Sequence, residues 1–282
     1  MHDSMRILVT SEPGSADRDN EDWLYARENL VAVLDGATAR TDTGCLHGVT
    51  WYARRLGETV VDLARDVSMP LPTALAQAIG RVAEEHRSTC DLEHPGTPSA
   101  AIGLVRFHPT SLEYLVLGDV SLVVDQDGQL NVVSDDRVSR TAAAERMAAD
   151  QHPIGSPSKA IALLAMKHAE LAARNVPGGY WIAEADPSVA QHALIGTAPV
   201  DDRTRVAVLS DGAARAVTLG LLDWPGAVDL LCSEGPAALI ARVRQAESED
   251  PHGTRWRRNK RSDDATAVYV DGFAGGGPVI AI

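Results

Sequence analysis

Apolar and polar residues recur along this chain with two different periods, and the periods predict its elements. Short unbroken apolar runs, rich in β-branched side chains and closed by glycine or polar residues, are typical of buried strands. Longer stretches, at 43–67 and 73–89, carry apolar residues at helical spacing. Further helices are predicted at 225–231 and 236–247, and strands at 5–10, 23–26, 30–34, 99–106, 113–117, 121–125, 130–134, 192–196, 205–209 and 265–270.

The order of these elements predicts the fold class. Consecutive strands between residues 99 and 134, with a turn signal at Asp127-Gly128, indicate an antiparallel meander. The predicted order along the chain is strands, helices, strands, helices and a last strand. This order is an α+β pattern, in which antiparallel sheets are covered by helices. Because no linker or repeat divides the chain, we expect one domain over residues 1–271. The Pro-, Gly- and Ala-rich part at 135–198 is expected to be a variable segment, and 272–282 a flexible tail.

Composition narrows the possible functions. The chain has 282 residues, with 39 acidic against 26 basic residues and a net charge of −13. This balance argues against binding to nucleic acid or to an anionic membrane surface, and it suits a protein that gathers carboxylates for cations. No signal-peptide pattern and no apolar run of transmembrane length occurs, so we expect a cytoplasmic protein, acting as a monomer.

The three cysteines carry a separate prediction. Cys45, Cys90 and Cys232 lie far apart in the sequence, are odd in number and form no CxxC pair. We therefore expect reduced, buried thiols in a reducing compartment, and no zinc site built on them.

Several carboxylates stand next to predicted strands, where a rigid backbone would hold them. Mg²⁺ and Mn²⁺ prefer such oxygen ligands. A single Asp beside Gly is more often a turn residue, and Asp127 is interpreted in that way. Carboxylates about 4 Å apart repel by roughly 4 kcal/mol per pair at an effective dielectric constant near 20, so convergence of these acids would require cations. The candidates are Glu21, Asp22, Asp35, Asp119, Asp211 and Asp263.

Five short motifs carry a resemblance to a known family. In these motifs, and in their order along nearly the whole chain, the sequence resembles the metal-dependent protein phosphatases of the protein phosphatase 2C type, bacterial members included. The resemblance implies an α-β-β-α sandwich of two antiparallel sheets, with a binuclear Mg²⁺ or Mn²⁺ centre between them and a mobile flap within 135–198. The motifs are Asn20-Glu21-Asp22, Val31-Ala32-Val33-Leu34-Asp35-Gly36, Leu117-Gly118-Asp119, Val208-Leu209-Ser210-Asp211-Gly212 and Asp263-Asp264-Ala265-Thr266-Ala267-Val268.

The resemblance also implies roles for single residues. Asp35 would bridge two metal ions, Gly36 would bind through its backbone carbonyl, and Glu21 would serve one ion. A water activated by both ions would then attack the phosphorus of phosphoserine or phosphothreonine in a protein substrate.

The second metal ion has its own implied ligands. Asp211 and Asp263 would bind it directly and Asp22 through water. Asp119 matches the position that supports a third, weaker metal in bacterial members.

The sequence departs from the family pattern at three places. Ala37 stands where many members have a histidine two residues after the bridging Asp, although several bacterial relatives also lack it. The usual phosphate-binding arginine position is Asp17; Arg18 either reaches the site from a shortened loop or is an exposed loop cation. At 118–121, the Ser-Arg pair that usually follows the Asp is missing, which puts the third metal in doubt.

Three functions fit these features. The leading one is a Mg²⁺- or Mn²⁺-dependent serine/threonine protein phosphatase. The departures motivate a catalytically weak binding or regulatory module, and the fold also suits a phosphatase of small metabolites. The basic run at 255–261 is interpreted as a solvated loop, with steering of phosphorylated substrate as the alternative.

Overall fold

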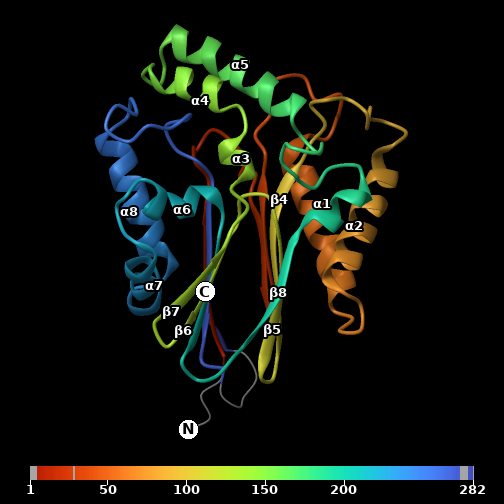
Figure 1. Ribbon diagram of the computed structural model, residues 1–282, viewed down its shortest axis with the longest axis vertical. Helices are drawn as coiled ribbons and strands as arrows, with labels where there is room; N and C mark the ends of the chain where they lie inside the picture. The colour runs from red at the N-terminus through yellow and green to blue at the C-terminus, as the bar shows by residue number, and fades with distance from the viewer. Residues whose placement is uncertain (1–4, 28, 274–278, 282) are drawn as a thin grey trace.

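The computed structural model describes residues 5–27, 29–273 and 279–281, and in it two β-sheets pack face to face (Figure 1). The sheet of six strands has the order β11-β1-β10-β9-β6-β7, and the sheet of five has the order β2-β3-β4-β5-β8. The strands are β1 Arg6–Glu12, β2 Trp23–Arg27, β3 Leu30–Gly36, β4 Ala100–His108, β5 Ser111–Leu117, β6 Ser121–Gln126, β7 Gln129–Val133, β8 Leu194–Pro199, β9 Thr204–Leu209, β10 Ala265–Asp271 and β11 Val279–Ala281.

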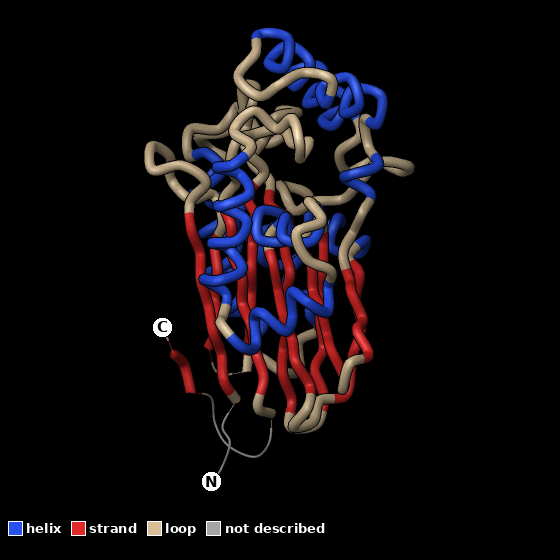
Figure 2. Tube along the Cα trace, turned by 90° about the vertical axis from the view of Figure 1, so that its left-hand side faces the viewer, coloured by secondary structure: helices blue, strands red, loops and turns tan. Residues whose placement is uncertain are grey.

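Helices cover the outer face of each sheet, and others lie across one end of the sandwich (Figures 1 and 2). The five-stranded sheet is covered by α1 Gly48–Ala64 and α2 Leu71–His86, with the 3₁₀ helix η1 Pro187–His192 against α2. The six-stranded sheet is covered by α6 Asp211–Thr218, α7 Trp224–Ser233 and α8 Pro236–Glu249. The helices at the upper end in Figure 1 are α3 Arg137–Arg140, α4 Ala143–Asp150 and α5 Pro157–Ala172.

The unbroken apolar run of β3 follows from burial on both faces. Leu30, Ala32 and Leu34 pack against α1 and α2, whereas Val31 and Val33 face the other sheet. A strand with only one buried face would alternate apolar and polar residues, so a continuous run indicates a middle layer. The predicted α-β-β-α sandwich is confirmed.

Four details differ from the sequence-based expectation. The predicted meander is wrong: β4 and β5 pair in one sheet and β6 and β7 in the other, because Gly118, at φ +83°, turns the chain between the sheets. Helix α6 was missed, and α1 begins at Gly48 rather than at residue 43. Within the predicted tail, β11 pairs in parallel with β1, while residues 274–278 and 282 lie outside the described residues.

The cysteines also differ from expectation. All three are free thiols, but none is fully buried. Cys45 and Cys90, far apart in the sequence, lie with their sulfur atoms 3.2 Å from each other. Sequence separation says nothing about this contact, because it depends on how the loop before α1 meets the end of α2.

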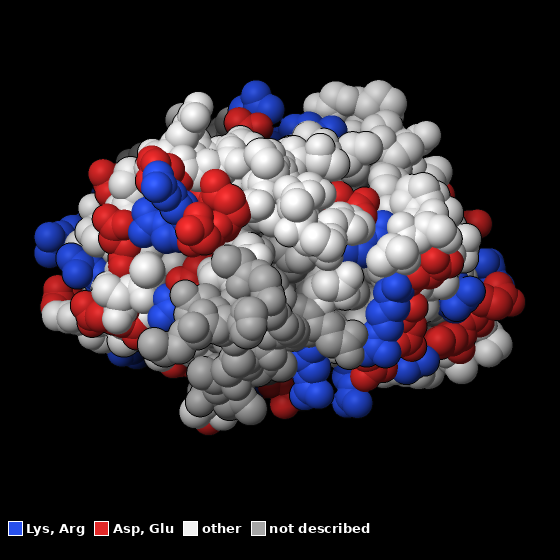
Figure 3. Space-filling model, turned by 90° about the horizontal axis from the view of Figure 1, so that it is seen from below, with Lys and Arg blue, Asp and Glu red and all other residues white. Residues whose placement is uncertain are grey.

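The structure can be compared with two expectations from composition, on binding to nucleic acid and on spanning a membrane. Figure 3 views the lower end of Figure 1, where acidic and basic side chains are interspersed on two flanks around a largely uncharged area. This view offers no basic stripe of the kind that binds nucleic acid. Among the described residues, no helix is both long enough and apolar enough to span a membrane.

Arg106 ties the end of α1 to the five-stranded sheet from a buried position on β4. Only 1% of this residue is exposed. Its guanidinium donates to the carbonyls of Ala64, Asp66 and Met69 at 2.8–2.9 Å and to Glu113 Oε1 at 2.7 Å. A buried charge with this many partners fixes the position of the connection between α1 and α2.

Replacing Arg106 by methionine keeps an unbranched apolar stem and removes every one of these bonds. Arg106→Met should lower the free energy of unfolding by roughly 3 kcal/mol, because three carbonyls lose the guanidinium and Glu113 keeps only His108 as a partner. Unfolding in urea measures this loss of free energy. The control is Arg54→Met, at an exposed ion pair with Glu58, which should cost no more than about 0.5 kcal/mol. Equal losses in the two variants would contradict this role of Arg106.

Candidate metal centre

The antiparallel topology brings strand ends with carboxylates to one edge of the sandwich. Asp35 lies at the end of β3, and Asp22 just before β2, its antiparallel neighbour. In the other sheet, Asp211 lies two residues after the end of β9, as the first residue of α6, and Asp263 lies two residues before the antiparallel β10. Asp119 lies in the connection from β5 to β6, which crosses between the sheets at this same edge.

Asp35 is at the centre of the cluster. Its Oδ2 accepts a hydrogen bond of 3.0 Å from the backbone N–H of Asp211. Burial raises the pKa of Asp35 well above its usual value, and the charges of four neighbours raise it further. Burial and then Asp263 raise the pKa of Asp211 as well. The four neighbours are Asp211, Asp22, Asp119 and Asp263.

Two more carboxyls share this environment. Burial, together with the charge of Asp211, raises the pKa of Asp22 and of Asp119 to about 7. The hydroxyls of Thr266 and Ser210 bond to Asp22, yet none of the described residues gives its Oδ2 a hydrogen bond. A buried carboxylate oxygen without a partner, beside other carboxylates, is in the position of a ligand for a cation.

Glu21 is held at the side of this cluster. Its Oε2 accepts a hydrogen bond of 2.5 Å from the Thr38 hydroxyl, and burial raises its pKa. Asp264 accepts from the backbone N–H groups of Gly14 and Glu21, each at 2.7 Å, and so fixes the loop before β2. Gly36 packs closely here, because a Cβ on it would lie 2.5 Å from the Glu21 carbonyl oxygen.

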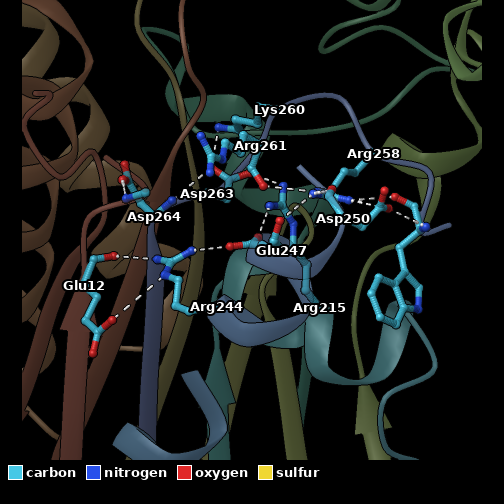
Figure 4. A network of polar contacts seen from close by, with 12 residues as sticks. Glu12, Arg215, Arg244, Glu247, Asp250, Arg258, Lys260, Arg261, Asp263 and Asp264 are labelled. Atoms are coloured by element: carbon cyan, nitrogen blue, oxygen red, sulfur yellow. Dashed lines mark hydrogen bonds and ion pairs between the residues drawn. The ribbon is translucent and has the colours of Figure 1, made fainter. Parts of the chain in front are cut away.

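Asp263 differs from the other acids because it already has cationic partners (Figure 4). The Arg215 guanidinium donates to its Oδ2 at 2.7 Å, and the Lys260 ammonium forms an ion pair with its Oδ1. Arg215 also binds Glu247 at 2.6 Å. Burial opposes the charge on Lys260, but Asp263 and Asp211 outweigh it and raise the pKa of Lys260. Asp263 is thus held in place by side chains of α6 and of the loop before β10.

A cavity of about 820 Å³ opens over Glu21 and Asp263. Arg18 is exposed and lines this cavity, so it fits both alternatives stated for it, and its role at the site stays a prediction. Sequence reasoning missed Arg40, Lys260 and Arg261, which line the same cavity. The basic character of 255–261 was the available signal for the last two.

The basic run is not a solvated loop throughout. Arg258 is 7% exposed, and its guanidinium bonds to Asp250 and to the carbonyls of Glu247, Trp256 and Arg261. Asp250 also accepts from the backbone N–H groups at 254–256. This network, shown in Figure 4, folds the run inward and places Lys260 over the acids.

The donor set determines which ion suits the centre. The side chains of the cluster that could bind a metal ion are carboxylates, with a hydroxyl beside Glu21. Oxygen-only sites suit hard divalent cations such as Mg²⁺ and Mn²⁺. Cations would also relieve the mutual repulsion that raises the pKa values of Asp35, Asp22 and Asp119. The residues present therefore fit the metal ions that the resemblance implies.

The chain is similar in sequence and fold to proteins of a known family. The family model for protein phosphatase 2C matches residues 14–274. No protein with a curated description matches the chain significantly.

Solved structures share the fold. The serine/threonine phosphatase PstP/Ppp of Mycobacterium tuberculosis gives a TM-score of 0.60 at 16% identity, covering 95% of this chain and 98% of that chain. The PstP catalytic domain in complex with two manganese ions gives 0.54 at 15% identity, covering 95% and 97%. The phosphatase MsPP from Mycobacterium smegmatis, in complex with cacodylate, gives 0.54 at 19% identity, covering 94% and 97%.

The raised pKa of Asp119 predicts how pH affects the metal-free protein. The pKa of Asp119, about 7, lies above the usual 3.8, so the folded protein holds the proton of this carboxyl more tightly than the unfolded chain does. The contribution of Asp119 to the free energy of unfolding is therefore fully present below about pH 4 and is lost as pH rises through about 7. With a chelator present, Asp119→Asn should therefore stabilise the fold at about pH 8, by on the order of 2–4 kcal/mol, and should have little effect near pH 4.

Chemical unfolding at both pH values measures this difference. Asp127→Asn, at a carboxylate that is 72% exposed, is the matched control and should change stability little at either pH. A stability gain that does not depend on pH would contradict the assigned repulsion.

Proposed function

The chain belongs to the protein phosphatase 2C family of serine/threonine phosphatases, and from this premise we propose that it is a Mg²⁺- or Mn²⁺-dependent phosphatase of phosphoserine and phosphothreonine proteins. One observation carries the proposal: carboxylates from both sheets converge at the family's motif positions, and burial and mutual repulsion raise the pKa of each of Asp35, Asp22, Asp119 and Asp211. Action as a monomer in the cytoplasm stays a prediction from the sequence.

Each acid has a proposed part in the centre. Asp35, with the Gly36 carbonyl, would be shared between two ions, and Glu21 would serve one of them. The manganese pair in the similar PstP structure supports this count. Ions bound there would lower the pKa of a water and neutralise the oxygens of a phosphate group.

The other ion has the second group of ligands. Asp211 and Asp263 would bind it, with Asp22 acting through water, and Asp119 would support a weaker third site. Arg215 would keep the Asp263 carboxylate oriented through the 2.7 Å bond to its Oδ2.

The chain's own cations are proposed to bind the phosphate group. Arg18, Arg40 and Lys260 line the cavity over Glu21 and Asp263, within reach of an anion that enters it. Lys260 is the best placed of these, because Thr38 Oγ1 at 3.0 Å and Asp263 hold its ammonium over the carboxylates. In this role it compensates for the arginine that the family usually has at the position of Asp17.

The ion pairs of Asp263 favour the alternative of a catalytically weak relative. Lys260 and Arg215 already occupy both oxygens of this carboxylate, so a metal ion has to compete with Lys260 for it. Such a protein would bind partners or phosphoproteins with negligible turnover. A phosphatase of small metabolites fits the same centre and would be distinguished by a panel of phosphorylated substrates.

Hydrolysis of a phosphothreonine peptide with Mn²⁺ tests the main proposal. Asp35→Asn and Asp211→Asn should each lower kcat by at least about 100-fold, because each removes charge that holds the ions. Asp127→Asn, at the exposed turn, should retain full activity. Equal turnover in the wild type and both site variants would refute the proposal, and no turnover in the wild type would favour the weak relative.

Lys260→Met separates phosphate binding from metal binding. The variant should raise KM for the phosphopeptide by about 10-fold or more, since a charge-assisted hydrogen bond is lost. Calorimetry should show Mn²⁺ affinity retained or increased, because the competing ammonium is gone. Arg257→Met, at an exposed neighbouring cation, should leave both quantities unchanged. Unchanged KM in Lys260→Met would contradict this role.

A further inference from the structure

A second cluster of potential metal ligands lies on the outer side of the five-stranded sheet. Cys45 is in the loop that joins β3 to α1, His86 is the last residue of α2, and Cys90 follows four residues later. The two sulfur atoms are 3.2 Å apart, and Cys45 Sγ is 3.7 Å from His86 Nδ1. One ligand atom from each residue lies within 4.8 Å of the other two.

Backbone N–H groups point at both sulfurs, and the surroundings favour a thiolate at Cys90. The N–H of Leu46 donates to Cys90 Sγ at 3.3 Å, and the N–H of His47 donates to Cys45 Sγ at 3.4 Å. These groups precede the 17-residue helix α1, whose N-terminal end attracts negative charge. Burial opposes ionisation of Cys90, but the hydrogen bonds with Cys45 and from Leu46 outweigh it and lower its pKa. Burial, followed by the hydrogen bond with Cys90, raises the pKa of Cys45, so this thiol has to release its proton when a metal ion binds. The thiolate is the form of cysteine that binds metal ions.

His86 supplies the nitrogen in the form that a metal needs. The residue is only 2% exposed, and burial, followed by the charge of His47, lowers its pKa, so the ring is neutral at physiological pH. Nδ1 contacts the Cys45 sulfur at 3.7 Å, whereas none of the described residues gives Nε2 a hydrogen bond. Nδ1 is therefore the nitrogen that faces the sulfur of Cys45 and can act as a ligand beside it.

We propose that Cys45, His86 and Cys90 bind a structural Zn²⁺ ion. Tetrahedral zinc with Zn–S of about 2.3 Å and Zn–N of about 2.0 Å places two sulfurs about 3.8 Å apart and a sulfur and a nitrogen about 3.5 Å apart. The distances here differ from these by about 0.6 Å and 0.2 Å, which small side-chain rotations provide. The fourth position is left to water, because both cysteines are partly exposed. Sulfur and imidazole ligands distinguish this site from the carboxylate centre, which suits harder ions.

The ion would fasten two loops to each other. Those loops already share a hydrogen bond from the Asp91 N–H to the Gly44 carbonyl at 2.9 Å. The loop with Cys45 begins after Gly36, the last residue of β3, and carries Thr38, which contacts Glu21 in the carboxylate centre. Zinc at the cysteines would therefore stabilise the fold and hold this loop in place without taking part in phosphate chemistry.

Cobalt and zinc titrations of the full-length, reduced protein test the site. Co²⁺ should produce a thiolate-to-metal charge-transfer band that saturates at about one equivalent, and Zn²⁺ should abolish it by replacing cobalt. Cys45→Ser, Cys90→Ser and His86→Gln should lower the affinity by at least about 10-fold. Two controls should leave the band intact: Cys232→Ser, at the third cysteine, and Asp35→Asn, in the carboxylate centre.

A second measurement needs no variant and so does not depend on how well each variant folds. Zn²⁺ should slow alkylation of Cys45 and Cys90 by iodoacetamide at least about 10-fold, as followed by mass spectrometry of peptides, and should leave Cys232 unprotected. Three results would overturn the site: no charge-transfer band, equal protection of Cys232, or a Cys45–Cys90 disulfide that persists in reductant and excludes the ion.

Discussion

Carboxylates buried at one edge of the sandwich repel one another, and the surrounding structure has to hold them against that repulsion. Burial raises the pKa of Asp35, and the negative charges of four neighbouring carboxylates raise it further: Asp211, Asp22, Asp119 and Asp263. A fold that only needed stability would place apolar side chains here, because burial of unpaired charge costs several kcal/mol. Bound cations would remove this repulsion, and its relief would add to the free energy of cation binding. The two sheets and the basic loop hold the carboxylates at this edge, and the cavity opens over them.

The parts that could be predicted from the sequence are those that depend on local pattern. The continuous apolar run of β3 indicated a strand buried on both faces, and the packing of Leu34 and Val33 against different layers agrees with it. Antiparallel neighbours then bring Asp22 beside Asp35, and Asp211 beside Asp263, because their strand ends meet at one edge. The motif order supplied the same acids. Their assignment as metal ligands remains a proposal.

The parts that the sequence did not reveal depend on contacts between distant residues. Lys260 belongs to the basic run at 255–261, which was interpreted as a solvated loop, yet its ammonium reaches Thr38, 222 positions away. The run turns inward because Asp250 accepts from its backbone and from Arg258. Cys45 and Cys90 are 45 positions apart and meet only because α1 and α2 form a hairpin. The spacing of apolar residues along the chain does not predict contacts between residues this far apart.

We expect the buried acids to form a cation centre, and calorimetric titration of the metal-free protein with Mn²⁺ at about pH 7 is the decisive test. Because Asp22 and Asp119 have pKa values of about 7, they are partly protonated before binding, so Mn²⁺ should bind with release of protons to the buffer. We expect saturable binding, a binding heat that changes with the ionisation enthalpy of the buffer, and the loss of both in Asp35→Asn. Absence of Mn²⁺ binding, or binding that Asp35→Asn leaves unchanged, would contradict it.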